Sequence, residues 1–260
     1  MTFAPFDLSG HVSLVTGGNR GIGLGIAHAL ALAGADIAIL GRDHDRNSEA
    51  TTALAAHGTS VLSLDVDVAV EAEVVDACGA VVAELGRIDS VFANAGVGGE
   101  PKPLLTTSTE DFHAVLRVNL DGAFWTMREA GRHMVERALA GDPGGSLVGI
   151  SSVAAAEAAP RQHAYAASKA GLVALVKATA VELARHGVRA NAIAPGWIAT
   201  EMTTELRANP RVAAKVNPRI PMRRWGQPQD LGGVAVYLAS PASSYHTGDV
   251  LVVDGGYGIF

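Results

Sequence analysis

Three residues in the second half of the chain have side chains that could move or hold a proton: Ser152, Tyr165 and Lys169. Tyr165 and Lys169 are four positions apart, so a helix would stack their side chains on one face. An ammonium group beside a phenol favours the ionised phenol and lowers its pKa. We therefore expect Tyr165 to exchange a proton near neutral pH, which is general acid and base chemistry.

Ser152 follows the apolar run 146–150, which is typical of a buried strand. Its hydroxyl would then lie at the carboxyl end of a sheet, where open α/β sheets bind ligands. A tyrosine and a lysine four apart also occur by chance on many helices. The chemistry therefore needs support from elsewhere in the chain.

That support lies near the N-terminus, where residues 16–23 have the sequence TGGNRGIG. A strand-like segment, 11–15, precedes them and a helix-like segment, 24–33, follows. This order is the fingerprint of a turn that binds the pyrophosphate of a dinucleotide at a helix N-terminus. The expected contacts are Gly17, Asn19, Arg20, Gly21, Ile22 and Gly23.

From end to end the chain resembles the classical short-chain dehydrogenase/reductase family. The matching motifs occur in the family's order and are TGGNRGIG at 16–23, Asp65 with Val66, Asn94-Ala95-Gly96, Asn119, Ser152, Tyr165 with Lys169, and Pro195-Gly196 with Thr200. The tail, 224–231 and 247–256, is similar to the branches of 3-oxoacyl reductases and sugar or polyol dehydrogenases. Nicotinamide-dependent hydride transfer to a carbonyl is what the resemblance implies.

The resemblance also implies roles for the polar residues. Tyr165 would protonate the carbonyl oxygen, and Lys169 would lower the tyrosine pKa and bind the nicotinamide ribose. Ser152 would hold the substrate oxygen, in preference to the nearby Ser151 and Ser168, because its spacing from Tyr165 is the family's. Asn119 would kink its helix and tie Lys169 to a water chain; a buried, helix-breaking amide is the alternative. His163 is expected to contact substrate or solvent.

The remaining family positions would hold the cofactor. Asp65, with Val66, would bond the adenine amino group, or else cap its strand. Asn94, Ala95 and Gly96 would form a wall beside the adenosine, although Asn94 could simply brace the sheet. Pro195, Gly196, Ile198 and Thr200 would lie on the nicotinamide side, where Thr200 would contact the carboxamide.

The end of the second strand predicts a preference for NADP, with NAD possible. NAD enzymes of this kind place there an acid that binds the ribose hydroxyls, whereas this chain has Gly41. The neighbouring Arg42, with Arg20, could bind a 2′-phosphate. Asp43 and Asp45 are the counter-indication, since either could bind the ribose instead.

Composition limits the partners and the location. The 260 residues carry a formal charge of −6, which gives no basic surface for nucleic acid. We expect no membrane-spanning stretch and no secretory signal. We also expect no metal site, because the histidines lack ligand spacing. Cys78 is the only cysteine, expected in the core, so a reducing cytoplasm is predicted.

Seven strand-like segments alternate with six or more helical ones. The strands are expected at 11–15, 35–40, 60–64, 88–92, 146–150, 188–193 and 250–253. Such alternation predicts one domain, 1–260, with a Rossmann-like, doubly wound, mostly parallel sheet and helices on both faces. A helix break is expected near 121–122. Residues 197–225 have the composition of a substrate lid, in which Arg219, Arg223 and Arg224 form a basic cluster.

The sequence thus predicts an NADP-preferring oxidoreductase that acts on a small carbonyl or alcohol substrate. A 3-oxoacyl, sugar or polyol, or small ketone compound would fit. The rival hypothesis is a non-catalytic dinucleotide-binding or scaffold protein, and epimerisation or dehydration of nucleotide sugars is a third option. We also expect a homotetramer, because the helices bearing Asn119 and Tyr165 commonly pair across subunits in the family.

Overall fold

The computed structural model describes residues 5–157 and 159–260. At its centre is one sheet of seven strands: β1 (Val12–Thr16), β2 (Asp36–Gly41), β3 (Val61–Asp65), β4 (Ser90–Ala93), β5 (Gly145–Ile150), β6 (Val188–Pro195) and β7 (Val250–Val253). The strand order is β3-β2-β1-β4-β5-β6-β7. Every neighbouring pair is parallel. The predicted fold is confirmed, with a sheet that is parallel throughout.

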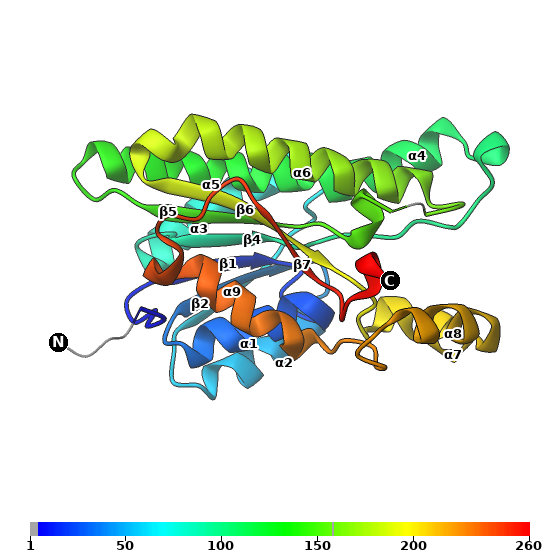
Figure 1. Cartoon of the computed structure of the whole chain (residues 1–260). Coiled ribbons are helices and arrows are strands. Elements are labelled where there is room, and N and C mark those ends of the chain that lie inside the picture. Colours follow the sequence, from blue (N-terminus) through cyan, green and yellow to red (C-terminus); the bar gives the residue numbers. More distant parts are fainter. Residues whose placement is uncertain (1–4, 158) are drawn as a thin grey trace.

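Helices cover both faces of this sheet (Figure 1). One face carries α3 (Glu71–Leu85), α4 (Thr109–Leu116), α5 (Gly122–Leu139) and α6 (His163–Leu183). The other carries α1 (Gly21–Leu32), α2 (His44–Ala55) and α9 (Gly232–Ala239). Two short helices, α7 (Thr204–Ala208) and α8 (Pro210–Val216), lie beyond the strands near the C-terminus.

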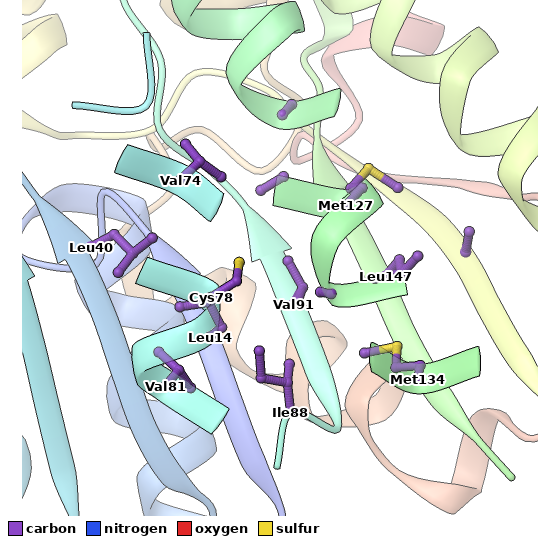
Figure 2. Close-up of a cluster of buried hydrophobic side chains, with 14 of the residues drawn as sticks. Leu14, Leu40, Val74, Cys78, Val81, Ile88, Val91, Met127, Met134 and Leu147 are labelled. Atoms are coloured by element: carbon purple, nitrogen blue, oxygen red, sulfur yellow. The ribbon is translucent and has the colours of Figure 1, made fainter. Parts of the chain in front are cut away.

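Strand residues alternate between two apolar cores, because successive side chains of a strand point to opposite faces. Leu14 packs with α3 and α5, whereas the next residue, Val15, packs with α1 and α9. Figure 2 shows the first core, where Cys78 of α3 and Met127 of α5 lie on either side of Val91 in β4. Cys78 is buried, as expected, and burial raises the pKa of its thiol to about 12.

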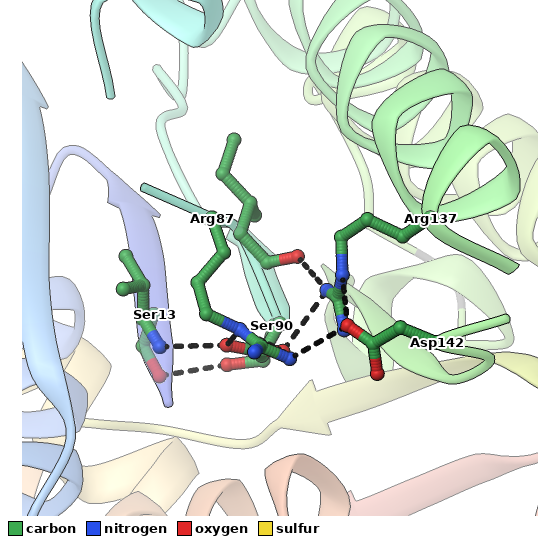
Figure 3. A network of polar contacts seen from close by, with 8 residues as sticks. Ser13, Arg87, Ser90, Arg137 and Asp142 are labelled. Carbon is green, nitrogen blue, oxygen red and sulfur yellow. Dashed lines mark hydrogen bonds and ion pairs between the residues drawn. The ribbon is translucent and has the colours of Figure 1, made fainter. Parts of the chain in front are cut away.

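A network of charges closes the amino end of the sheet (Figure 3). Asp89, just before β4, is 7% exposed and accepts a hydrogen bond from the backbone N–H of Val12 at 2.9 Å. Arg87 and Arg137 donate to the same carboxylate at 2.7 and 3.0 Å. Both arginines also reach Asp142. The buried Asp89 carboxylate is therefore fully paired and joins the segments at this end of the sheet.

The helical region before β5 differs from its prediction. Instead of breaking at 121–122, the chain passes from α4 to α5 through one π-helical turn, Arg117–Asp121. Such a turn inserts one residue without interrupting the helix and often marks a functional site. Asn119 lies in this turn and is buried.

One helical segment, His163–His186, is long and apolar enough to cross a membrane, judged by length and composition alone. The sequence analysis expected no such segment. In the structure this helix packs Leu172, Val176 and Ala180 into the first core, against the sheet. These three residues therefore form the inner face of a core helix.

Candidate active site

A cleft of about 1000 Å³ opens at the carboxyl ends of the strands. It lies where the strand order reverses between β1 and β4, the switch point at which open α/β sheets bind ligands. Most residues predicted for catalysis and cofactor binding line it: Gly17, Asn19, Arg20, Gly21, Ile22, Arg42, Val66, Asn94, Ala95, Gly96, Ser152, Tyr165, Lys169, Pro195, Gly196, Ile198 and Thr200.

Three predicted site residues do not line the cleft. Gly23 faces the chain itself, since a Cβ there would lie 2.2 Å from the Gly17 carbonyl oxygen. The Asp65 carboxylate is held outside by Asn47 and His44, each at 2.8 Å. Asn119 lies behind the cleft wall, where it is 1% exposed.

The glycine-rich turn has the shape that a dinucleotide requires. Gly17 and Gly21 have φ angles of +62° and +53°, in the left-handed region that side chains disfavour. A Cβ on Gly18 would lie only 2.6 Å from the side chain of Ile39. The backbone is therefore bare on the side of the cleft, and the N–H groups at the start of α1 remain available for a phosphate.

Hydrogen bonds join the turn to β4. The Thr16 hydroxyl accepts from the backbone N–H groups of Asn94 and Ala95, both at 3.0 Å. In return, the Asn94 amide donates to the Thr16 carbonyl at 2.9 Å. Asn94 thus braces the sheet at its switch point and also lines the cleft.

Lys169 is the buried charge at the floor of the cleft. It is 4% exposed, and its Nζ donates to the Ile150 carbonyl at 2.8 Å. Burial lowers the pKa of this ammonium to about 8. The Ser151 hydroxyl holds the Lys169 carbonyl at 3.0 Å, so Ser151 positions the lysine and leaves Ser152 facing the cleft.

Tyr165 lies one turn earlier on α6, with the Lys169 Nζ 5.7 Å from the centre of its ring. The sequence analysis predicted a lowered phenol pKa. In the polypeptide alone burial raises the pKa of Tyr165, and hydrogen bonding with Ser152 only partly opposes this rise. The prediction fails here because the ammonium is directed at the Ile150 carbonyl and not at the phenol oxygen.

Asn119 is tied to both sides of the site. Its amide exchanges hydrogen bonds with the backbone of Val97, at 2.8 and 3.0 Å, and donates to the Ser168 hydroxyl at 3.1 Å. A Cβ on Gly96 would lie 3.2 Å from Asn119 Oδ1 and 3.4 Å from Lys169 Nζ. Only a glycine therefore leaves the space between the asparagine and the lysine open.

The adenosine side carries the features expected for a phosphate. Gly41 ends β2, and a Cβ there would lie 2.4 Å from Asn19 Nδ2, so a larger residue at this position would require Asn19 to shift. Arg42 lines the cleft and lies 3.5 Å from Asp67. Asp43 caps α2 through the N–H of Arg46 at 3.2 Å. Arg46 also lines the cleft, although no sequence motif had singled it out.

A smaller cavity of about 170 Å³ adjoins Tyr165. Polar residues from the loop after β4, from α4 and from the segment that leads into α6 line it, among them Glu100, Asp111, Arg161, Gln162 and His163. Lys102 pairs with both acids, at 3.2 and 2.7 Å. Except for His163 these residues were missed, because loop positions carry no periodicity that the sequence could reveal.

Residues 197–225 contain α7, α8 and no strand, and they pack on an aromatic group of Trp197, Trp225 and Tyr257. Each arginine of the expected cluster has a different partner. Arg219 stacks on Tyr257 with its guanidinium 4.2 Å from the ring centre. Arg223 donates to a backbone carbonyl, and Arg224 pairs with Asp230.

Comparison with known proteins agrees with this geometry. A family model described as enoyl-(acyl carrier protein) reductase matches residues 17–258. The gluconate 5-dehydrogenase of Gluconobacter oxydans is 37% identical over 251 residues, which cover 96% of each chain. The 3-oxoacyl-(acyl-carrier-protein) reductase FabG of Chlamydia pneumoniae is 36% identical over 96% of this chain and 97% of its own.

The fold agrees as closely. The crystal structure of a gluconate 5-dehydrogenase from Burkholderia cenocepacia, in complex with NADP and tartrate, superposes with a TM-score of 0.93. It is 36% identical, and the match covers 99% of this chain and 98% of that one. The chain belongs to the short-chain dehydrogenase/reductase family. It is an NAD(P)-dependent oxidoreductase that transfers hydride between nicotinamide and a carbonyl or secondary alcohol, and the non-catalytic alternative is not supported.

Proposed function

We propose that the catalytic group of this oxidoreductase is Ser152, Tyr165, Lys169 and Asn119. The observation that carries the proposal is the buried ammonium of Lys169 one turn from the half-buried Tyr165 on α6, in a cleft with a dinucleotide cradle. Buried ionisable groups without an opposite charge are unfavourable for folding, so they concentrate at functional sites.

In this mechanism the chain handles the proton while bound reduced nicotinamide supplies the hydride. The Ser152 oxygen accepts from the Ala154 N–H at 3.1 Å, and its hydroxyl, which also bonds Tyr165, would bond the substrate oxygen beside the phenol. Tyr165 delivers a proton to that oxygen. Burial raises the pKa of the phenol, so Tyr165 holds its proton at neutral pH and can donate it.

Lys169 and Asn119 support these groups. One of the three ammonium protons of Lys169 bonds Ile150, which leaves two for the cofactor ribose and for a water. Asn119 fixes the loop that bears Gly96 and Val97, and so keeps the space beside Lys169 open. Asn119 is therefore a positioning residue.

We also propose a preference for NADP. Gly41 stands where a ribose-binding acid would be needed for NAD, while Arg20 and Arg42 line the cleft. An arginine that binds a phosphate contributes about 1.5–3 kcal/mol, or roughly ten- to hundredfold in affinity. Fluorescence titration should show NADP bound that much more tightly than NAD, with the difference lost in Arg42→Ala. Tighter binding of NAD by the wild type would refute the preference.

For the substrate we propose a keto sugar acid and its alcohol. The names of the relatives support this class, and so does the cavity beside Tyr165, where Lys102 pairs with the two acids and Arg161 adds a second cation on the wall. Several hydroxyls and a carboxylate would meet donors there. 3-Oxoacyl thioesters are the second candidate, because one relative is named as a 3-oxoacyl-(acyl-carrier-protein) reductase.

A substrate panel with NADPH tests this class. A 5-keto sugar acid, the uncharged ketose of matched length, a 3-oxoacyl thioester and a cyclic ketone would be compared by kcat/KM. We expect the keto acid to be preferred. Arg161→Gln should raise its KM about tenfold and leave that of the uncharged ketose unchanged. A preference for the thioester would contradict the substrate class but not the reaction.

We further propose one domain, 1–260, with residues 197–225 as its lid, in a cytoplasmic homotetramer. Exposed apolar side chains support assembly: Phe124 on α5 and Val181 on α6 are 42% and 84% exposed, and Ile259 and Phe260 are 94% and 69% exposed. Sedimentation velocity would show four chains. A monomer at every concentration would contradict the assembly.

A further inference from the structure

Three charged side chains meet across the mouth of the cleft. Glu201 begins the turn Glu201–Thr203, at the start of the proposed lid. Its Oε2 lies 2.7 Å from Arg46 Nη1, on α2, and 3.3 Å from Arg20 Nη1, in the glycine-rich turn. All three side chains line the cleft. We call this group the Glu201 clasp.

The clasp contributes little to the stability of the fold. The side chains of Arg20, Arg46 and Glu201 are 55%, 37% and 62% exposed, and exposed ion pairs contribute about 0–1 kcal/mol. Arg46 holds the pKa of the Glu201 carboxyl below its usual value, so the group is charged at neutral pH. An ion pair that contributes little to stability but carries full charges can be replaced by an anionic ligand that binds the same arginines.

Two further ion pairs lie at this end of the cleft. Arg42 lies 3.5 Å from Asp67, and Arg46 Nε lies 3.2 Å from Asp43. Arg20 has one carboxylate partner, Glu201, among the ion pairs of the described residues. Arg20 and Arg46 carry two positive charges, and Glu201 and Asp43 carry two negative ones, so an additional anion meets arginines whose charge is already balanced.

We propose that Glu201 determines cofactor discrimination by competing with the ribose 2′-phosphate for Arg20 and Arg46. NADP must displace the carboxylate, whereas NAD, which has no 2′-phosphate, leaves the clasp closed. The exchange also frees the first turn of the lid from the floor of the cleft. This proposal rests on the NADP preference proposed above.

Adenosine fragments test the competition without turnover, because they lack nicotinamide. Adenosine 2′,5′-bisphosphate and adenosine 5′-monophosphate differ only in the 2′-phosphate and would be titrated by calorimetry into wild type and Glu201→Gln. We expect the variant to bind the bisphosphate about three- to tenfold more tightly, while its affinity for the monophosphate stays within twofold. The control is Glu205→Gln, an exposed glutamate one turn further along the lid, which should change neither.

A double-mutant cycle locates the effect. Arg46→Gln alone should weaken binding of the bisphosphate, and Glu201→Gln should gain less in the Arg46→Gln background, because the arginine is what both anions share. Thermal unfolding at one protein concentration confirms that each variant is folded.

The outcomes separate this proposal from the NADP preference on which it rests. Equal tightening of both fragments, or none, in Glu201→Gln overturns the competition while a wild-type preference for the bisphosphate keeps the NADP proposal. If the wild type does not prefer the bisphosphate at all, both proposals fall.

Discussion

The two ends of the parallel sheet treat a buried charge in opposite ways. At the amino end the Asp89 carboxylate, 7% exposed, has two arginines and a backbone N–H around it. At the carboxyl end the Lys169 ammonium, 4% exposed, has the Ile150 carbonyl, and no ion pair joins it to a carboxylate of the described residues. One charge is fully compensated and the other is not.

This difference separates stability from function. Removing a compensated buried charge leaves its partners unpaired, so such a group is important for folding. An uncompensated charge weakens the fold but keeps hydrogen-bonding capacity for a ligand, as the lowered pKa of Lys169 shows. Substitutions at the carboxyl end should therefore change rates, and those at the amino end should change stability.

The largest effect is expected at the carboxyl end, for Tyr165→Phe. Loss of the transferable proton should lower kcat by roughly 10²–10⁴-fold, which is about 3–5 kcal/mol in the barrier. Steady-state rates measure this, and cofactor affinity from fluorescence titration should stay within twofold. A variant that keeps more than about a tenth of the rate would sink the acid and base assignment.

His163→Gln is the matched control, because His163 borders the same small cavity two residues before the tyrosine. It should change kcat by less than about tenfold, the scale of a substrate contact. If its loss equals that of Tyr165→Phe, the proton comes from the histidine.

At the amino end, Asp89→Asn should leave kcat within twofold and lower the free energy of unfolding by about 2–4 kcal/mol. Its two arginines would then lose the buried carboxylate and keep only the exposed Asp142. Urea unfolding at one protein concentration measures the loss. Asp142→Asn, whose side chain is 55% exposed, is the control and should cost about 0–1 kcal/mol. Equal costs would remove the distinction between buried and exposed partners.

Lys169→Met should do the reverse: abolish activity and stabilise the cofactor-free protein at pH 7. The folded pKa is about 8 against an ordinary value of 10.5, so below pH 8 the charged lysine is unfavourable for folding. Each pKa unit corresponds to about 1.4 kcal/mol, and allowing for the lost Ile150 hydrogen bond we expect a gain of about 1–3 kcal/mol.

The lowered pKa of Lys169 also predicts how the stability of the wild type changes with pH. Between pH 8 and 10.5 the unfolded lysine holds its proton while the folded one loses it, so wild-type stability rises with pH in this window. Lys169→Met lacks that rise, so the difference in the free energy of unfolding between the variant and the wild type should become smaller. Above about pH 10 the raised pKa of Tyr165 acts in the opposite sense in both proteins. A constant gap from pH 7 to 10 would contradict the buried, uncompensated lysine.

The sequence predicted the strands and the cleft well, because apolar runs and glycine spacing are local properties. Val250–Val253 is found where the pattern placed it, and Gly41 ends its strand as expected. The direction of the Tyr165 pKa was wrong, since spacing along a helix does not say which carbonyl a neighbouring ammonium faces. Long-range pairings such as Arg46 with Glu201 join segments far apart in the chain, and no local pattern encodes them.

The smallest change is expected for Gly96→Ala, which tests how closely the carboxyl end is fitted. The added methyl would lie 3.2 Å from Asn119 Oδ1 and 3.4 Å from Lys169 Nζ, tighter than ordinary contact, so one of them must shift by a few tenths of an ångström. Because Lys169 is held by a single hydrogen bond, the lysine should move and the asparagine should stay.

A shift of this size should lower kcat about three- to tenfold, near 1 kcal/mol in the barrier, and leave the Tm within about 2 °C. Gly98→Ala is the control: Gly98 lines the same cleft, but nothing lies within 4 Å of its added Cβ. Stopped-flow hydride transfer and thermal unfolding would be measured on both. If Gly96→Ala lost stability and kept its rate, the space beside Lys169 would serve packing, as at the amino end, and the contrast between the two ends would fail.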